Sequence, residues 1–311
     1  MQQDLAFIFP GQGSQKEGML TEIAAGHASI QATFKEASEI LGYDLWALCQ
    51  NDPDKKLSLT HITQPAILSA SVALWRLWLE QDGYKPSLMA GHSLGEYSAL
   101  VSGGVLAFQD AVMLVQKRGE FMQSAVPVGI GAMAAIVGLA DADVIAACKE
   151  VAEGEIVGAV NFNSPGQVVI AGHVEAVNRA IESCKAKGAK RALPLPVSAP
   201  FHSALMQPAA DRFAEVLNGI TLNAPEIPVL QNYSLTLTSN DTDAIKENLI
   251  KQIYSPVPWV ETINRFVQQG VKQVIEIGPG KVLCGLNKRI APEMESLSIN
   301  DSANLTAALE A

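Results

Sequence analysis

The chain alternates between short apolar runs and longer segments in which apolar residues recur at helical spacing. Residues 5–9 and 87–91 are short apolar runs next to glycine or proline, which is typical of buried strands. Helical spacing is seen at residues 19–40, 65–79, 94–101 and 108–122. This succession of strands and helices predicts an α/β core with a mostly parallel sheet.

The middle of the chain has a different rhythm. Strands are expected at residues 131–137, 156–162, 167–171 and 190–195, and helices at 141–151 and 174–187. This β-α-β-β-α-β order is that of a ferredoxin-like unit. We therefore expect residues 128–197 to form a small subdomain inserted into a catalytic domain of residues 1–127 and 198–311. Beyond the insert we expect helices at 203–217, 260–269 and 282–290, and strands at 226–231 and 273–277.

Composition limits the class of protein. The chain has 311 residues, of which 48% are hydrophobic and 17% charged, so a large buried core is expected and disorder is excluded. A formal net charge of −10 argues against a nucleic-acid-binding protein. Cys49, Cys148, Cys184 and Cys284 are scattered, which favours reduced thiols over a zinc site or a disulfide framework. We find neither a secretory signal nor an apolar run long enough to span a bilayer, and we expect a cytoplasmic protein without membrane contact.

The run Gly91-His92-Ser93-Leu94-Gly95 fits the pattern G-x-S-x-G where a strand is expected to end and a helix to begin. In this context the motif forms a nucleophile elbow, whose glycines permit a sharp turn and whose serine oxygen projects above the sheet. The N–H of Leu94 would lie at a helix N-terminus and could stabilise an oxyanion. A plain glycine-rich turn is the alternative, and the strand–helix context favours the nucleophile.

A nucleophilic serine needs a base. His27 and His61 are interpreted as surface residues, His173 as the neighbour of a helix cap, and His92 as a wall of the site because adjacent elbow side chains point apart. His202 lies where the chain leaves the insert, and a loop histidine there could overhang the sheet. Spacing alone leaves open whether it is the base.

Other polar residues have weaker signals. The loop that follows residues 5–9 is neither a dinucleotide-binding loop nor a P-loop, and the N–H of Gln12 could join the oxyanion site. Arg118 is either a solvated arginine or a ligand for a substrate carboxylate. Gln252 and Asn163 could each orient the histidine or line the pocket.

Seven short segments together resemble the malonyl-CoA:acyl carrier protein transacylases, over nearly the whole chain. In order they are Phe9-Pro10-Gly11-Gln12-Gly13-Ser14-Gln15, Gly91-His92-Ser93-Leu94-Gly95-Glu96-Tyr97, Gln116-Lys117-Arg118-Gly119, Asn161-Phe162-Asn163-Ser164-Pro165-Gly166-Gln167, Pro200-Phe201-His202, Tyr254-Ser255-Pro256-Val257 and Glu276-Ile277-Gly278-Pro279-Gly280. Any one of these segments is weak evidence, but seven in this order are specific. The resemblance implies an α/β-hydrolase-like core with a ferredoxin-like small domain.

The resemblance also implies roles for the residues. Ser93 would carry the acyl group, His202 would be its general base and later acid, and Arg118 would pair with the malonyl carboxylate. The N–H groups of Gln12 and Leu94 would form the oxyanion hole.

Three further residues receive supporting roles in the same way. Gln252 would orient the histidine through its main-chain carbonyl, and Asn163 would sit at the pocket edge. Phe201 beside the histidine would favour malonyl over methylmalonyl groups.

The implied reaction is ping-pong transfer from malonyl-CoA to the phosphopantetheine thiol of acyl carrier protein in fatty-acid synthesis, by a monomer that needs no cofactor. The carrier is acidic, so a local basic patch is expected. The candidates are Lys190, Arg191, Lys281, Lys288 and Arg289.

Three alternatives remain at this point. A serine hydrolase or thioesterase of the α/β class shares the elbow, but such an enzyme acting on neutral esters has no use for Arg118. An acyltransferase of a polyketide pathway would share every segment. A module that only binds partners has no chemical reason to keep Ser93, His202 and Arg118 together.

Overall fold

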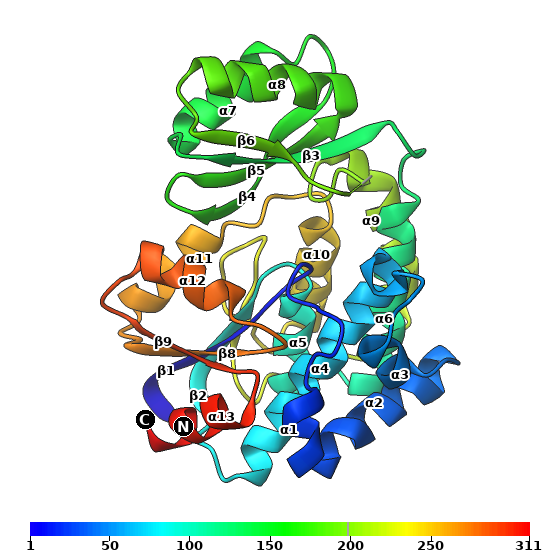
Figure 1. Cartoon of the computed structure of the whole chain (residues 1–311), viewed down its shortest axis with the longest axis vertical. Helices are drawn as coiled ribbons and strands as arrows, with labels where there is room; N and C mark the ends of the chain where they lie inside the picture. The colour runs from blue at the N-terminus through cyan, green and yellow to red at the C-terminus, as the bar shows by residue number, and fades with distance from the viewer. Residues whose placement is uncertain (198) are drawn as a thin grey trace.

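The computed structural model describes residues 1–197 and 199–311, and it contains a parallel sheet and a separate antiparallel sheet (Figure 1). The parallel sheet has the strand order β7-β2-β1-β8-β9. Its strands are β1 Gln2–Phe9, β2 Pro86–Gly91, β7 Val229–Leu230, β8 Gln273–Ile277 and β9 Glu295–Ile299. This arrangement confirms the prediction of an α/β fold with a mostly parallel sheet.

Helices cover both faces of the parallel sheet (Figure 1). Those before the antiparallel sheet are α1 Thr21–Gly26, α2 Ala28–Leu41, α3 Leu45–Gln50, α4 Thr60–Glu80, α5 Gly95–Ser102 and α6 Phe108–Gln123. Those after it are α9 Gln207–Asn218, α10 Thr242–Gln252, α11 Trp259–Gln268, α12 Val282–Ile290 and α13 Ser302–Glu310, with 3₁₀ turns at Lys56–Ser58 and Ala204–Met206.

The alternation of side chains along β1 explains why both faces are covered. Leu5, Phe7 and Phe9 point to one face and pack with α4, α5 and α6, whereas Ala6 and Ile8 point to the other and pack with α11 and α12. Because every one of these side chains is buried, the strand reads as a continuous apolar run rather than an alternating one.

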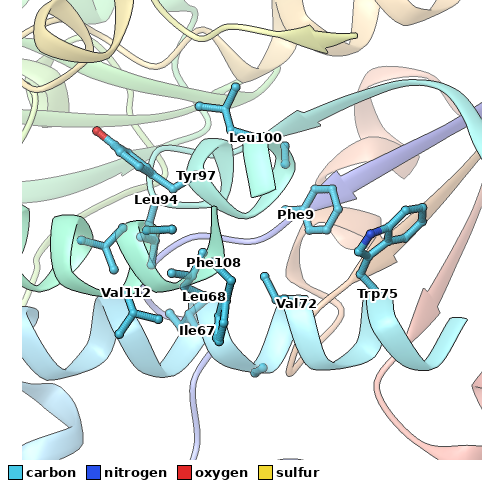
Figure 2. Close-up of a cluster of buried hydrophobic side chains, with 14 of the residues drawn as sticks. Phe9, Ile67, Leu68, Val72, Trp75, Leu94, Tyr97, Leu100, Phe108 and Val112 are labelled. Carbon is cyan, nitrogen blue, oxygen red and sulfur yellow. The ribbon is translucent and has the colours of Figure 1, made fainter. Parts of the chain in front are cut away.

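The larger core is built around α4, which is buried along most of its length. Figure 2 shows Ile67, Leu68, Val72 and Trp75 of this helix packed beneath the elbow segment and β1. The indole of Trp75 meets the ring of Phe7 edge to face at 5.7 Å. This packing holds in place the layer of side chains that lies beneath the elbow segment.

The antiparallel sheet has the order β4-β5-β3-β6, with α7 and α8 on its outer face (Figure 1). Its elements are β3 Gly131–Val137, α7 Asp141–Glu150, β4 Val157–Ser164, β5 Gln167–His173, α8 Val174–Ala186 and β6 Arg191–Pro194. β4 is joined to the main body by two backbone hydrogen bonds, from Phe162 N to Val257 O at 3.0 Å and from Val257 N to Val160 O at 2.8 Å.

Several expected elements differ in the structure. The single helix expected at 19–40 is two helices, because His27 adopts an extended backbone between them. The helix expected at 65–79 begins at Thr60 and holds Pro65 inside it. The strand expected at 226–231 is reduced to Val229–Leu230, and the helix expected at 203–217 begins as a 3₁₀ turn followed by α9.

Other elements were not expected at all: α3, α10, β9 and α13. Ser198, at the expected domain boundary, lies outside the described residues. Within the described residues, no helix combines the length and the hydropathy needed to cross a membrane.

Candidate active site

The elbow between β2 and α5 carries Ser93 with a φ of 53°, in the left-handed region. Glycine is needed on both sides of it. A Cβ on Gly91 would lie 1.8 Å from the carbonyl carbon of Gly95, and a Cβ on Gly95 would lie 2.0 Å from the carbonyl oxygen of Phe9. The close approach of α5 to the end of β1 therefore depends on the two glycines of the motif.

Substituting Gly95 with alanine is expected to destabilise the protein by roughly 3 kcal/mol, because the new methyl group would collide with backbone that cannot move aside. Chemical denaturation would measure the free energy of unfolding. Gly285→Ala in α12 is the matched control, since its Cβ would meet nothing within 4 Å, and we expect it to stabilise the helix by about 0.5–1 kcal/mol. Equal free energies for the two variants would contradict the packing argument.

Ser93 Oγ lies 2.7 Å from Nε2 of His202. His202 Nδ1 lies 2.9 Å from the main-chain oxygen of Gln252. A carbonyl oxygen can only accept, so Nδ1 carries the proton and Nε2 presents its lone pair to the serine hydroxyl. Burial, followed by the nearby Arg118 cation, lowers the pKa of His202 to about 3, which keeps the imidazole neutral and able to accept a proton.

Arg118 enters the same site from α6 and is only 2% exposed. Its Nη2 donates to Ser93 Oγ at 3.2 Å and to Gln252 Oε1 at 2.9 Å, and its Nη1 donates to Gln64 Oε1 at 2.8 Å. Burial lowers the pKa of Arg118, yet a guanidinium starts so high that it stays charged. These partners are hydroxyl and amide oxygens, so the cation can still receive an anionic group beside Ser93 Oγ.

The backbone around the serine supplies donors for an oxyanion. Leu94 is the N-cap residue of α5, and its N–H belongs to the first helical turn, where donors have no carbonyl partner within the helix. The N–H of Ser93 is already used, because it donates to Asn232 Oδ1 at 2.8 Å. Gln12 faces the same cavity from the loop after β1, and this loop is pressed against the elbow: a Cβ on Gly11 would lie 2.5 Å from His92 O.

These groups border a cavity of about 490 Å³ between the two sheets. Of the residues expected in the site, it is lined by Gln12, Ser93, Leu94, Arg118, Asn163, Phe201 and His202. Gln252 lies behind them, in contact with both Arg118 and His202. A more open hollow of about 590 Å³ along α2 and α3 contains none of these residues.

The other histidines have different partners. His92 lines the cavity, as expected of a wall residue, and its Nε2 lies 2.8 Å from Asn163 Oδ1 on β4. His173 precedes α8 and its Nδ1 accepts from the N–H of Ile156. His27 and His61, expected on the surface, are half-buried.

Sequence reasoning missed three polar residues of the site. Gln64 holds Arg118, Asn232 holds the N–H of Ser93, and the fully buried Glu96 contacts both Asn232 and Gln252. The only signal available was the position of Glu96 directly after the elbow motif. Gln64 and Asn232 lie in segments that no motif distinguishes.

Comparison with known proteins shows the family to which the chain is similar. The model of the family described as "Acyl transferase domain" matches residues 6–297. The malonyl CoA-acyl carrier protein transacylase of Escherichia coli (strain K12) is 57% identical over 305 residues, covering 98% of each chain, and that of Bacillus subtilis (strain 168) is 46% identical over 308 residues, covering 98% of this chain and 96% of the relative.

Solved structures agree with these matches. An acyl carrier protein S-malonyltransferase from Vibrio cholerae has a TM-score of 0.96 at 55% identity, covering 98% of this chain and 99% of that one. A malonyl-transacylase in complex with a type II PKS acyl-carrier protein has a TM-score of 0.97 at 55% identity, covering 99% of both chains. The chain therefore belongs to the acyl transferase family, within the group of the malonyl-CoA:acyl carrier protein transacylases.

Proposed function

We propose that the chain transfers a malonyl group from malonyl-CoA to the phosphopantetheine thiol of acyl carrier protein, in fatty-acid synthesis. One observation carries this proposal: a buried guanidinium, Arg118, lies 3.2 Å from Ser93 Oγ, which itself lies 2.7 Å from His202 Nε2. A nucleophile, a base and a cation for a carboxylate are the groups that this transfer requires. The names of the relatives describe the same substrate and acceptor.

In the first half-reaction Ser93 Oγ attacks the thioester carbonyl while its proton passes to His202 Nε2. The N–H groups of Leu94 and Gln12 stabilise the oxyanion. The carbon–sulfur bond then breaks, and coenzyme A leaves as a thiol with the proton that His202 held. In the second half-reaction the carrier thiol gives its proton to His202 and takes the malonyl group from Ser93, and His202 returns that proton to Ser93 Oγ as the ester bond breaks. The exchange of a thioester for a thioester balances without a redox step, so the reaction as written needs no cofactor.

Substrate selection is assigned to residues around the acyl site. Arg118 would pair with the free carboxylate of the malonyl group. Phe201 lines the cavity next to the base and packs against both the main core and the small sheet, which supports a role in favouring malonyl over methylmalonyl. Asn163, held by His92, would form the pocket edge on the small sheet.

The finer architecture is also part of the proposal. We assign residues 1–127 and 198–311 to an α/β-hydrolase-like catalytic domain and residues 128–197 to a ferredoxin-like inserted subdomain. The strand order β4-β5-β3-β6 with two helices on one face supports the second assignment. Every group of the site comes from one chain, which supports a monomer, and the buried free thiols support a cytoplasmic location.

The carrier protein is acidic and would need basic residues near the cavity. Lys190, Arg191, Lys281, Lys288 and Arg289 are all exposed. Arg289 is the best placed of them, because its Nη1 donates to Oε1 of Gln167, a residue that lines the cavity. We assign the docking of the carrier to this end of α12.

Intact-protein mass spectrometry after mixing with malonyl-CoA tests the proposal. The expected result is one malonyl adduct that maps to Ser93, is absent in Ser93→Ala, and disappears when the carrier with its phosphopantetheine arm is added. Charge reversal at Lys288 and Arg289 should slow only this second step. An adduct that water removes as fast as the carrier does would instead favour the hydrolase or thioesterase alternative.

The polyketide alternative is supported by one neighbour, the transacylase found with a type II PKS carrier protein. Transfer to a fatty-acid carrier and to a polyketide carrier can be compared under the same conditions. We expect faster transfer to the fatty-acid carrier, and the opposite order would assign the chain to polyketide assembly.

A further inference from the structure

Gln252 contacts all three groups of the proposed chemistry. Its main-chain oxygen accepts from His202 Nδ1 at 2.9 Å and its Oε1 accepts from Arg118 Nη2 at 2.9 Å. Its Nε2 donates to the main-chain oxygen of Ser93 at 3.0 Å. A rotation or shift of this one residue would therefore disturb the base, the cation and the elbow together.

Something must hold the amide of Gln252 in this orientation, and the contact at its nitrogen end is a carboxylate. Nε2 of Gln252 donates to Oε2 of Glu96 at 2.8 Å. A guanidinium can only donate and a carboxylate prefers to accept, so Arg118 and Glu96 fix opposite ends of the same amide. Glu96 lies on α5, one turn beyond Ser93, and is 0% exposed.

Glu96 also contacts the elbow through a second residue, Asn232. The N–H of Asn232 donates to the same Oε2 at 2.9 Å. The side chain of Asn232 in turn accepts from the N–H of Ser93 at 2.8 Å and donates to Gly91 O at 2.7 Å. The carboxylate thus holds two residues that border the nucleophile, Gln252 and Asn232.

The partners of Glu96 indicate its charge state. Beyond Asn232 and Gln252, Nε2 of Gln231 donates to its Oε1 at 3.2 Å, so all three partners are N–H donors. Burial raises the pKa of Glu96 above its usual value, and these donors and the Arg118 cation offset only part of that rise. An ionised carboxylate accepts all of these hydrogen bonds, while a protonated one would point its O–H at an N–H.

From these contacts we propose that Glu96 is a positioning residue, which acts through Gln252 to hold Arg118 and His202 in register with Ser93. It touches no reacting atom, and its negative charge lies one amide away from the buried cation. The role rests on the proposed function for the reaction that it serves, but the reactivity of Ser93 can be measured without that reaction.

The test uses Glu96→Gln, which keeps the shape of the side chain and replaces one acceptor by a donor. A fluorophosphonate probe labels activated serines and does not require a malonyl group, so its labelling of Ser93 reports on the Ser93–His202 pair alone. We expect the labelling rate and the kcat for malonyl transfer each to fall by about tenfold. The labelled fraction should reach that of the wild type, since a purely structural role would lower the fraction rather than the rate.

A double-mutant cycle with Gln252→Met tests whether the effect passes through Gln252. If it does, Glu96→Gln slows labelling by less than twofold when Gln252 is already methionine. The control is Ser98→Ala on the same helix, whose buried Oγ has no hydrogen-bond partner among the described residues, and its labelling rate should equal that of the wild type.

Two results would overturn the role of Glu96: an unchanged labelling rate in Glu96→Gln, or rate losses that multiply in the double variant. If Glu96→Gln does not fold, Glu96→Asp replaces it in the same cycle, because a shorter carboxylate cannot reach both Asn232 and Gln252. A wild-type protein that labels with the probe but accepts no malonyl group would instead contradict the proposed function and leave the cycle interpretable.

Discussion

Replacement of Arg118 with alanine is expected to invert the acyl preference of the enzyme. Malonyl transfer should fall by about 10²- to 10³-fold, since the lost charge-assisted contact in a buried site is worth roughly 3–4 kcal/mol. Acetyl transfer should rise, because an acetyl group in the wild-type site leaves a guanidinium that is 2% exposed without an anionic partner. The rates of adduct formation from malonyl-CoA and acetyl-CoA give the ratio directly.

Arg212→Ala is a matched control for this experiment. Arg212 lies on α9, donates to Ser124 Oγ and stacks on the ring of Phe121, outside the cavity lining. Its removal should leave the malonyl-to-acetyl ratio unchanged. An unchanged ratio in Arg118→Ala as well would mean that the carboxylate binds elsewhere.

Replacement of His202 with alanine should slow the acylation of Ser93 by about 10³- to 10⁴-fold, the range for loss of a general base that activates a serine. The imidazole is the group within 2.7 Å of Ser93 Oγ that can accept a proton, and water in its place would be a far weaker base. Rapid quenching followed by intact-protein mass spectrometry would give the acylation rate. His27→Ala, at the junction of α1 and α2, should acylate at the wild-type rate, and a His202→Ala variant within tenfold of wild type would exclude the imidazole as the base.

The His202→Ala substitution should also change how the stability of the protein depends on pH. Burial, followed by the Arg118 cation, lowers the pKa of His202 to about 3, while an unfolded chain protonates histidine near its ordinary value of about 6.5. Between these two values the unfolded state binds more protons, so the wild type loses stability as the pH falls. The His202→Ala variant should lose less stability than the wild type over that pH window. His92, whose pKa is also lowered by burial, should account for part of the pH dependence that remains.

The parts of this site that sequence could predict are those encoded locally. The elbow at Ser93 follows from an apolar strand, two glycines and a helical pattern in direct succession. His202 and Arg118 were left open by spacing and gained roles only through the resemblance. The structure places their functional atoms within hydrogen-bonding distance of Ser93 Oγ.

The parts that sequence could not predict depend on packing between distant segments. α10, which ends at Gln252, buries few of its residues and shows little apolar periodicity, so nothing marked it as a helix. Glu96 and Asn232 are 136 positions apart and meet only because β7 pairs with β2. Around residue 27 the apolar residues keep their helical spacing, although the extended backbone of His27 separates two helices there. The spacing alone therefore could not reveal the break.

The attachment of the antiparallel sheet has a consequence for the width of the cavity between the two sheets. β4 is bonded to Val257, five positions beyond Gln252, and Asn163 at the end of the same strand is bonded to His92 on the elbow. A movement of the antiparallel sheet away from the parallel sheet would pull on the segment that holds the imidazole of His202 and on His92, which precedes Ser93. We therefore expect that widening the cavity for a bulkier thioester would also displace Ser93 and His202 from each other, and that such substrates would react more slowly.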